Sequence, residues 1–87
     1  MARYSLEIRR SAAREIEAVP TKKERRLVVG RISKLAQDPR PPGAEKLTGR
    51  ERYRVRQGWY RIVYEIEDAA LVVRIVKVGH RREVYRR

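Results

Sequence analysis

The stretch RYRVRQGWYRIVY, residues 52–64, decides how the rest of the chain is interpreted. Side chains alternate along both halves, and Gly58-Trp59 lies between them, which is the pattern of two β-strands joined by a tight turn. A glycine at the first central position suits a two-residue type II′ turn. Such a turn predicts which residues face each other across the hairpin: Gln57 and Tyr60, Arg56 and Arg61, Val55 and Ile62, Arg54 and Val63, Tyr53 and Tyr64, and Arg52 and Glu65.

This register gives the hairpin an apolar side and a basic side. The apolar side is a candidate core layer, and the basic side gathers Arg54, Arg56 and Arg61. Two arginines directly opposite each other destabilise a hairpin by roughly a few tenths of a kcal/mol. One interpretation is a solvated face whose arginines splay apart. The other is a phosphate pocket, because guanidinium groups bind phosphate oxygens in a bidentate way and stay charged at any relevant pH.

The composition indicates a single small domain, residues 1–87. Apolar residues make up 41% of the chain, which is enough for one small core. The absence of cysteine excludes disulfides, thiolate nucleophiles and cysteine-based zinc sites, and it suits a reducing cytoplasm. We see no signal peptide at the start of the sequence, and no apolar run approaches the ~20 residues that cross a bilayer. We therefore expect a cytoplasmic protein that does not act in a membrane.

The positive charge is the strongest global signal. There are 23 Lys and Arg residues against 11 Asp and Glu, for a net charge of +12. Residues 1–50 carry 13 basic and 6 acidic side chains, and residues 51–87 carry 10 and 5, so the excess is not confined to a tail. Such a chain attracts polyanions through phosphate contacts and counterion release. We expect nucleic acid or the ribosome as a partner, and an acidic protein partner fits the same charge.

The remaining segments predict the fold. Residues 3–8 alternate as a half-buried strand, and a short helix follows. A longer helix begins at Thr21, three residues before Glu24, which is the spacing of a capping box. Residues 37–51 hold three of the four prolines and indicate a loop. With a last strand at 71–79, the order β-α-α-β-β-β predicts the α+β class: a small, mostly antiparallel sheet with two helices packed on one face.

The last two strands are expected to join through a two-residue turn near Asp68-Ala69. That turn predicts that Ile62 faces Ile75, so the apolar sides agree across three strands. The basic side then continues with Arg74 and Val78. Arg74 is therefore a further candidate for phosphate binding.

The segment VGHRREVYRR, residues 78–87, follows the last predicted strand. It holds the only histidine, His80, with Arg81 and Tyr85 shortly after it. The end of a strand beside a basic sheet face is a suitable place for chemistry. The alternative for His80 is a surface residue in a basic tail, and for Tyr85 it is a packed aromatic anchor.

Four segments together resemble a RelE-type toxin of the RelE/ParE superfamily, the toxic half of a toxin–antitoxin pair: SAAREIEAVP, ISKLAQDPRPPGAEKLTG, YRVRQGWYRIVYEI and VGHRREVYRR. The resemblance covers nearly the whole chain and rests on the order and spacing of these segments. It implies a fold similar to microbial ribonucleases and a ribosome-dependent endoribonuclease that enters the A site, cuts mRNA and inhibits translation. It also implies an acidic, RelB-like antitoxin in a heteromeric complex.

The resemblance implies roles for particular residues. Arg54 and Arg56 match the basic pair on the first strand of the hairpin, and Arg61 matches the arginine of a G-x-Y-R motif. Arg81 matches the arginine after the last strand, and Tyr85 matches the C-terminal tyrosine. The best-known pattern of the family has lysines at the first two of these positions. A general-base role does not transfer to them, because arginine in practice keeps its proton.

Metal-independent RNA cleavage uses the 2′-OH as nucleophile, and it needs a proton acceptor, stabilisation of the phosphorane and a donor to the 5′-oxygen. We expect Arg61 and Arg81 to hold the scissile phosphate, while either Tyr85 or His80 transfers protons. No acidic or histidine cluster has metal-ligand spacing and no Gly-rich phosphate loop is present, so we expect neither a metal nor a cofactor. The residues expected to bind flanking phosphates are Arg54, Arg56, Lys46 and Arg74.

Two other functions fit the same sequence. The first is a ParE-like inhibitor of DNA gyrase, with the same fold and no RNA chemistry. The second is a non-enzymatic basic module that binds RNA or DNA. The segment GHRREVY favours the nuclease, because the resemblance gives this tail to the members that cut RNA.

Overall fold

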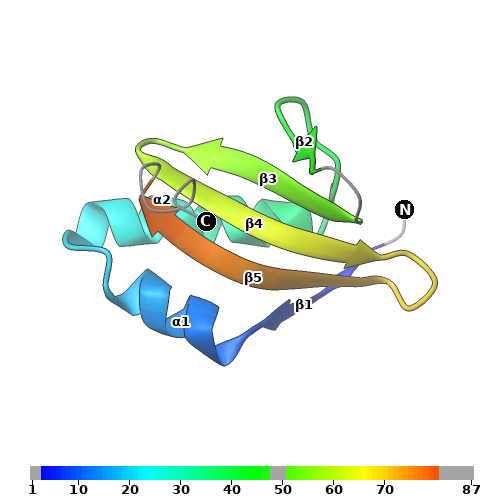
Figure 1. Cartoon of the computed structure of the whole chain (residues 1–87), viewed down its shortest axis with the longest axis horizontal. Coiled ribbons are helices and arrows are strands. Elements are labelled where there is room, and N and C mark those ends of the chain that lie inside the picture. Colours follow the sequence, from blue (N-terminus) through cyan, green and yellow to red (C-terminus); the bar gives the residue numbers. More distant parts are fainter. Residues whose placement is uncertain (1–2, 48–50, 81–87) are drawn as a thin grey trace.

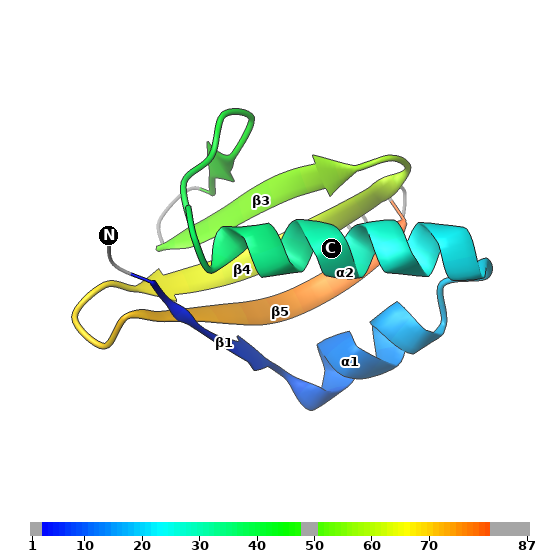
Figure 2. The ribbon, with the colours of Figure 1, turned by 180° about the vertical axis from the view of Figure 1, so that it is seen from behind.

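The computed structural model describes residues 3–47 and 51–80. Its strands form one five-stranded sheet in the order β1-β5-β4-β3-β2, in which β1 runs parallel to β5 and the other neighbours are antiparallel (Figure 1). Both helices cover the same face of the sheet (Figure 2), as the α+β prediction requires. No helix in the described part of the chain is long and apolar enough to span a membrane. The elements are β1 (Ser5–Ile8), α1 (Arg10–Glu17), α2 (Lys22–Leu35), β2 (Glu45–Lys46), β3 (Arg52–Gln57), β4 (Tyr60–Glu67) and β5 (Val72–His80).

The core lies between the helices and the three long strands. Helix α2 begins at its predicted cap, where the Thr21 hydroxyl accepts a hydrogen bond from the Glu24 backbone amide at 3.1 Å. Burial of one large aliphatic side chain contributes about 1.5–3 kcal/mol to stability. The three buried aliphatic side chains of α2 therefore fix this helix on the sheet. The helices contribute Ala12, Ile16, Val28, Ile32 and Leu35, and the strands contribute Tyr53, Val55, Ile62, Tyr64, Ile66, Val73, Ile75 and Val78.

The β3–β4 hairpin has the predicted register at all six pairs. Gly58 has a φ of 59°, as the first central residue of a type II′ turn requires. The Tyr53 and Tyr64 rings stack with centroids 5.8 Å apart, and the Tyr64 hydroxyl donates to the Pro39 carbonyl at 2.6 Å. Burial raises the pKa of Tyr64 to about 12, so the hydroxyl keeps the proton that this bond needs.

The predicted β4–β5 register is wrong. The turn takes four residues rather than two, and Leu71, its last residue, has a φ of 55°. Ile75 therefore faces Tyr64, and a β-bulge then places Ile62 opposite Val78. Val78 is only 2% exposed and belongs to the core, not to the basic side. A non-glycine residue seldom adopts positive φ, so nothing in the local sequence indicates this turn.

Strand β1 is more exposed than the alternation predicted. Its apolar residues Leu6 and Ile8 are 37% and 45% exposed. The strand lies at one edge of the sheet, and the helices pack mainly over β3, β4 and β5. An alternating pattern alone therefore placed the right residues on the helix side but overestimated their burial.

The loop before β2 is tied down at Arg40. Its guanidinium group donates to both carboxylate oxygens of Asp68, at 3.2 and 2.9 Å, and to the Tyr53 hydroxyl at 3.1 Å. The Tyr4 hydroxyl also donates to Asp68, at 2.6 Å. These bonds, first that of Arg40 and then that of Tyr4, lower the pKa of Asp68 to about 2. They hold the segment that leads to β2 against the sheet.

Gly30 lies inside α2, where glycine is unfavourable by about 1 kcal/mol relative to alanine. A Cβ atom built at this position meets no atom within 4 Å. Close packing therefore does not account for the glycine, and we have no structural explanation for it.

Candidate phosphate-binding site

Four arginines line one cleft of about 320 Å³ beside β3, near the short strand β2. Two of the arginines come from β3, one from β4 and one from α2. Strand β2 adds Glu45, so four elements contribute to the site. This size lies at the lower end of the range for small-ligand pockets. We call this space the arginine cleft, and its lining residues are Arg31, Gly43, Glu45, Arg54, Arg56 and Arg61.

The hairpin register explains why three of these arginines meet. Arg54 and Arg56 lie two positions apart on β3, so they share a face, and Arg56 is directly opposite Arg61. The other neighbour of Arg61 is Gly79 of β5, which has no side chain to crowd it. Arg61 is only 5% exposed, whereas Arg56 is exposed. The fold thus places a buried guanidinium in the wall of an open, strongly basic cleft, which favours an anionic ligand.

Glu45 is the carboxylate in the lining, and the sequence analysis missed it. The Arg54 guanidinium donates to its Oε1 through Nη2 and, at 3.1 Å, through Nε. This bond, followed by the charges of Arg54, Arg56 and Arg61, lowers the pKa of Glu45, so the carboxylate is ionised at neutral pH. Its side chain is 65% exposed. A phosphate oxygen can take the place of this exposed carboxylate beside the arginines. Alternatively, the carboxylate can accept a proton from a nearby hydroxyl group.

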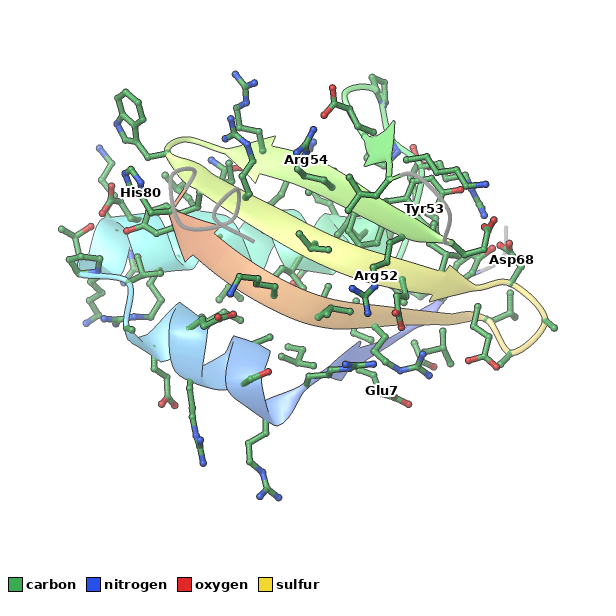
Figure 3. The ribbon with its side chains drawn as sticks, viewed as in Figure 1. Glu7, Arg52, Tyr53, Arg54, Asp68 and His80 are labelled. Atoms are coloured by element: carbon green, nitrogen blue, oxygen red, sulfur yellow. The ribbon has the colours of Figure 1, made fainter. Side chains whose placement is uncertain are left out.

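Arg74 lies outside the arginine cleft. Its guanidinium binds three carboxylates, with distances of 2.7 Å to Glu7, 3.5 Å to Glu65 and 3.2 Å to Glu67. Glu65 in turn is 2.9 Å from Arg52, its partner across β3 and β4. Figure 3 shows Arg52 and Glu7 on this part of the sheet. The charge ladder, as this set is called below, consists of Arg9, Arg52, Arg74, Glu7, Glu65 and Glu67.

Lys46 and His80 also lie outside the lining of the arginine cleft. The Lys46 ammonium is 2.8 Å from Glu51. Strand β5 continues through His80, which faces Tyr60 of β4, so Gly79 does not end the strand. His80 lines a second cleft of about 360 Å³, together with Glu15, Ala18, Val19, Pro20, Tyr60, Val78 and Gly79.

Two of the residues predicted to be catalytic, Arg81 and Tyr85, lie outside the described residues, and their roles remain predictions. The described ranges contain no cluster of three or more His, Asp or Glu side chains that could hold a metal ion. The expectation of a site without a metal likewise remains a prediction. Within the described part of the chain, the chemistry available in the arginine cleft is that of guanidinium groups and one carboxylate.

Arg31 is the second residue of the site that sequence reasoning missed. It lies three residues after Val28 and four before Leu35, at the flank of the buried stripe of α2. That spacing was available in the sequence as a signal for a cation at the boundary of the core. Glu45 carried no such signal, because it lies in a proline-rich segment without periodicity.

Known proteins with similar sequences or folds point to one family. The family described as the ParE toxin of type II toxin–antitoxin system, parDE, has a model that matches residues 6–85. Toxin RelG of Mycobacterium tuberculosis is 29% identical over 87 residues, which cover 97% of this chain and 98% of that protein. A chain of the Mycobacterium tuberculosis toxin–antitoxin complex RelBE2 superposes with a TM-score of 0.78 at 25% identity, covering 90% of this chain and 98% of the other. A free mutant of Escherichia coli toxin RelE gives 0.76 at 27% identity, with coverage of 98% and 92%.

Proposed function

Because the chain belongs to the ParE toxin family of type II toxin–antitoxin systems, within the RelE/ParE superfamily, we propose that this toxin is an endoribonuclease that cuts mRNA on the ribosome. The observation that carries the proposal is the arginine cleft. The described residues of its lining, four arginines and one carboxylate, place an excess of positive charge around a space that suits a phosphate. The relatives named RelG and RelE support the same reading.

In the proposed reaction the 2′-OH attacks the adjacent phosphorus, and the bond to the 5′-oxygen breaks. Arg61 and Arg56 bind the phosphate oxygens and stabilise the extra charge of the phosphorane. Glu45 takes the proton of the 2′-OH, because its carboxylate is the proton acceptor among the described residues that line the cleft. The 5′-oxygen receives a proton from Tyr85 or His80. A product with a 2′,3′-cyclic phosphate and a fragment with a free 5′-OH result.

The proposal includes a cognate antitoxin and a place of action. A chain of net charge +12 attracts an acidic partner, and we propose that an acidic, RelB-like antitoxin covers the arginine cleft in a heteromeric complex. The similar chain from the RelBE2 complex supports such a partner. A target in the ribosomal A site would place the toxin in the cytoplasm.

The direct test combines the purified protein with translating ribosomes and mRNA, followed by mapping of the new 5′ ends. Cleavage that requires ribosomes supports the proposal, and intact mRNA at full dose contradicts it. Glu45→Gln, Tyr85→Phe and His80→Gln then separate the proton-transfer roles. The acceptor role of Glu45 predicts a loss of about 10²–10⁴-fold in the single-turnover rate of Glu45→Gln, with phosphate binding retained.

Inhibition of DNA gyrase is the second candidate function, because the matching family model describes a ParE toxin. The same preparation can be tested in a gyrase supercoiling and DNA-cleavage assay. Gyrase-dependent DNA breaks with intact mRNA would favour this second candidate. Cleaved mRNA with unaffected gyrase would favour the nuclease.

A further inference from the structure

We propose that Trp59 and His80 form a platform on which one nucleobase of a single-stranded RNA stacks, at the end of the hairpin beyond the Arg56–Arg61 pair. The idea rests on the proposed function only in taking RNA as the ligand. It adds a binding site for a base to a cleft that otherwise recognises phosphate.

The two rings form a rigid aromatic surface. They are nearly parallel, with an interplanar angle of 8° and centroids 6.2 Å apart. Tyr60 meets the His80 ring edge-on, at 79° and 5.9 Å. The indole comes from the β3–β4 turn and the imidazole from the end of β5, so two elements of the sheet fix the orientation of the stack. A fixed aromatic plane loses little conformational freedom when a ligand stacks on it.

The Trp59 side chain is presented to solvent. It is 58% exposed, the highest value among the large apolar side chains in the described ranges. A hairpin turn is usually occupied by small or polar residues, and the large indole at this position instead offers an aromatic face that a ligand can stack on. Stacking on His80 therefore holds the indole in place without burying it.

The turn that carries Trp59 lies close to the Arg56–Arg61 pair along the hairpin, whereas His80, the other ring of the platform, pairs with Tyr60 on the helix-facing side of the sheet. The Arg56–Arg61 pair is followed by Gln57–Tyr60, and then by the turn that carries Trp59. Two residues of a strand span about 7 Å, a distance that one nucleotide can bridge. Figure 3 shows His80 at the end of the sheet, with Arg54 farther along β3 toward Asp68. Proteins that bind single strands combine a basic groove with aromatic side chains in this way, and the stacking tolerates any base.

The charge of the surroundings selects RNA over an apolar protein partner as the occupant. The exposed Arg56 and the buried Arg61 lie within two to three residues of Trp59 along the hairpin. Stacking of bases on an indole is compatible with these cations, because the phosphates of the same strand neutralise them.

The experiment uses the full chain without ribosomes and with RNA that cannot be cut. A fluorescein-labelled, fully 2′-O-methylated single strand is compared with a series in which one base at a time is replaced by an abasic residue. Affinity is measured by anisotropy at one salt concentration. Because the chain has a single tryptophan, its fluorescence reports directly on stacking at Trp59. We expect quenching on binding, and one abasic position that weakens binding by roughly 5- to 150-fold.

The decisive comparison is between the parent and Trp59→Leu. In Trp59→Leu the loss from that abasic position should fall below about twofold, whereas Trp59→Phe should keep part of it. Leu71→Ala is the matched control, since it removes an exposed apolar side chain from the turn between β4 and β5 and should bind like the parent. Equal abasic losses in the parent and Trp59→Leu would overturn the platform. So would a Trp59→Leu variant that binds RNA normally and loses only an acidic protein partner.

The outcome is independent of the nuclease assay. A protein that leaves mRNA intact but shows the coupling between Trp59 and one base keeps the platform and loses the nuclease proposal. A protein that cuts mRNA without this coupling keeps the nuclease proposal and loses the platform.

Discussion

Two groups of arginines in this toxin differ in their surroundings. In the charge ladder three arginines meet three glutamates, so the charges balance. Among the described residues that line the arginine cleft, four arginines lie beside one carboxylate, Glu45. Balanced charges add stability to the folded chain, whereas concentrated like charges reduce it and attract an anion. Within the described residues, the two groups of arginines therefore differ in how many carboxylates lie beside them, and we propose that this difference separates structural cations from candidate ligand-binding ones.

The largest expected effect is the difference in the rate of ribosome-dependent cleavage between Arg61→Gln and Arg74→Gln. Arg61→Gln should lower the single-turnover rate by about 10²–10³-fold, because in the proposed reaction Arg61 donates to the developing charge of the phosphorane. Arg74→Gln should lower the rate by less than about threefold, since its partners are the carboxylates of the charge ladder. Arg61→Lys tests whether positive charge alone restores the rate, and thermal unfolding checks that each variant is folded. Similar losses at both positions would remove the distinction between the two groups.

The next effect is on stability, where substitution in the charge ladder should cost more than substitution in the arginine cleft. Glu65→Gln should lower the free energy of unfolding by about 1–2 kcal/mol, because Glu65 accepts charge-assisted bonds from Arg52 and Arg74 at a site that is only 23% exposed. Glu45→Gln should lower it less, because Glu45 is exposed and its bond is screened by solvent. Urea unfolding of the two variants and the parent measures both. A larger loss in Glu45→Gln would mean that the cleft also stabilises the fold.

Acid should weaken the charge ladder and the Arg40–Asp68 contact. Burial opposes ionisation of Glu65, but hydrogen bonds from Arg52 and Arg74 outweigh it and lower the pKa of Glu65 below 4.5. Asp68 is lowered from 3.8 to about 2. A carboxylate with a lowered pKa in the folded state stabilises the protein above its ordinary pKa, and this contribution is lost as the pH falls. The midpoint temperature of thermal unfolding should therefore fall as the pH is lowered from about 4.5 to about 2. In Asp68→Asn it should fall less steeply. The same dependence of the midpoint on pH in the parent and in Asp68→Asn would contradict a stabilising role for the Asp68 carboxylate.

The smallest effect is a change in salt dependence. Arg56→Gln should reduce the slope of log affinity against log salt by about 0.7 for single-stranded RNA, because one phosphate contact is lost. Arg52→Gln should leave the slope unchanged, since Arg52 is paired with Glu65. Anisotropy titrations at four or more salt concentrations give the slopes. The same slope for Arg56→Gln as for the parent would place Arg56 outside the RNA path.

The features of the fold that follow from short-range patterns were predictable from the sequence. Alternation and a glycine at the first turn position gave the β3–β4 register, and with it the meeting of Arg54, Arg56 and Arg61. The capping box gave the start of α2. These features depend on neighbouring residues, so one sequence contains the information.

The features that depend on packing between distant segments were not predictable. The β4–β5 register depends on a four-residue turn with Leu71 at positive φ and on a bulge, neither of which has a local signal. The arginine cleft gains Arg31 from a helix and Glu45 from a two-residue strand in a loop. The compensation of Arg74 likewise depends on carboxylates from two other strands. Alternation placed Arg74 on the correct face but could not show which charges surround it.

Gly30 offers a practical route to studying variants that would otherwise be too unstable to purify. Its missing side chain faces open space on α2, so Gly30→Ala should stabilise the helix by about 1 kcal/mol without moving a neighbouring atom. A parent protein with this substitution would tolerate the losses expected for Glu65→Gln. Substitutions in the charge ladder and in the arginine cleft could then be compared in one background, with differences in activity separated from differences in the amount of folded protein.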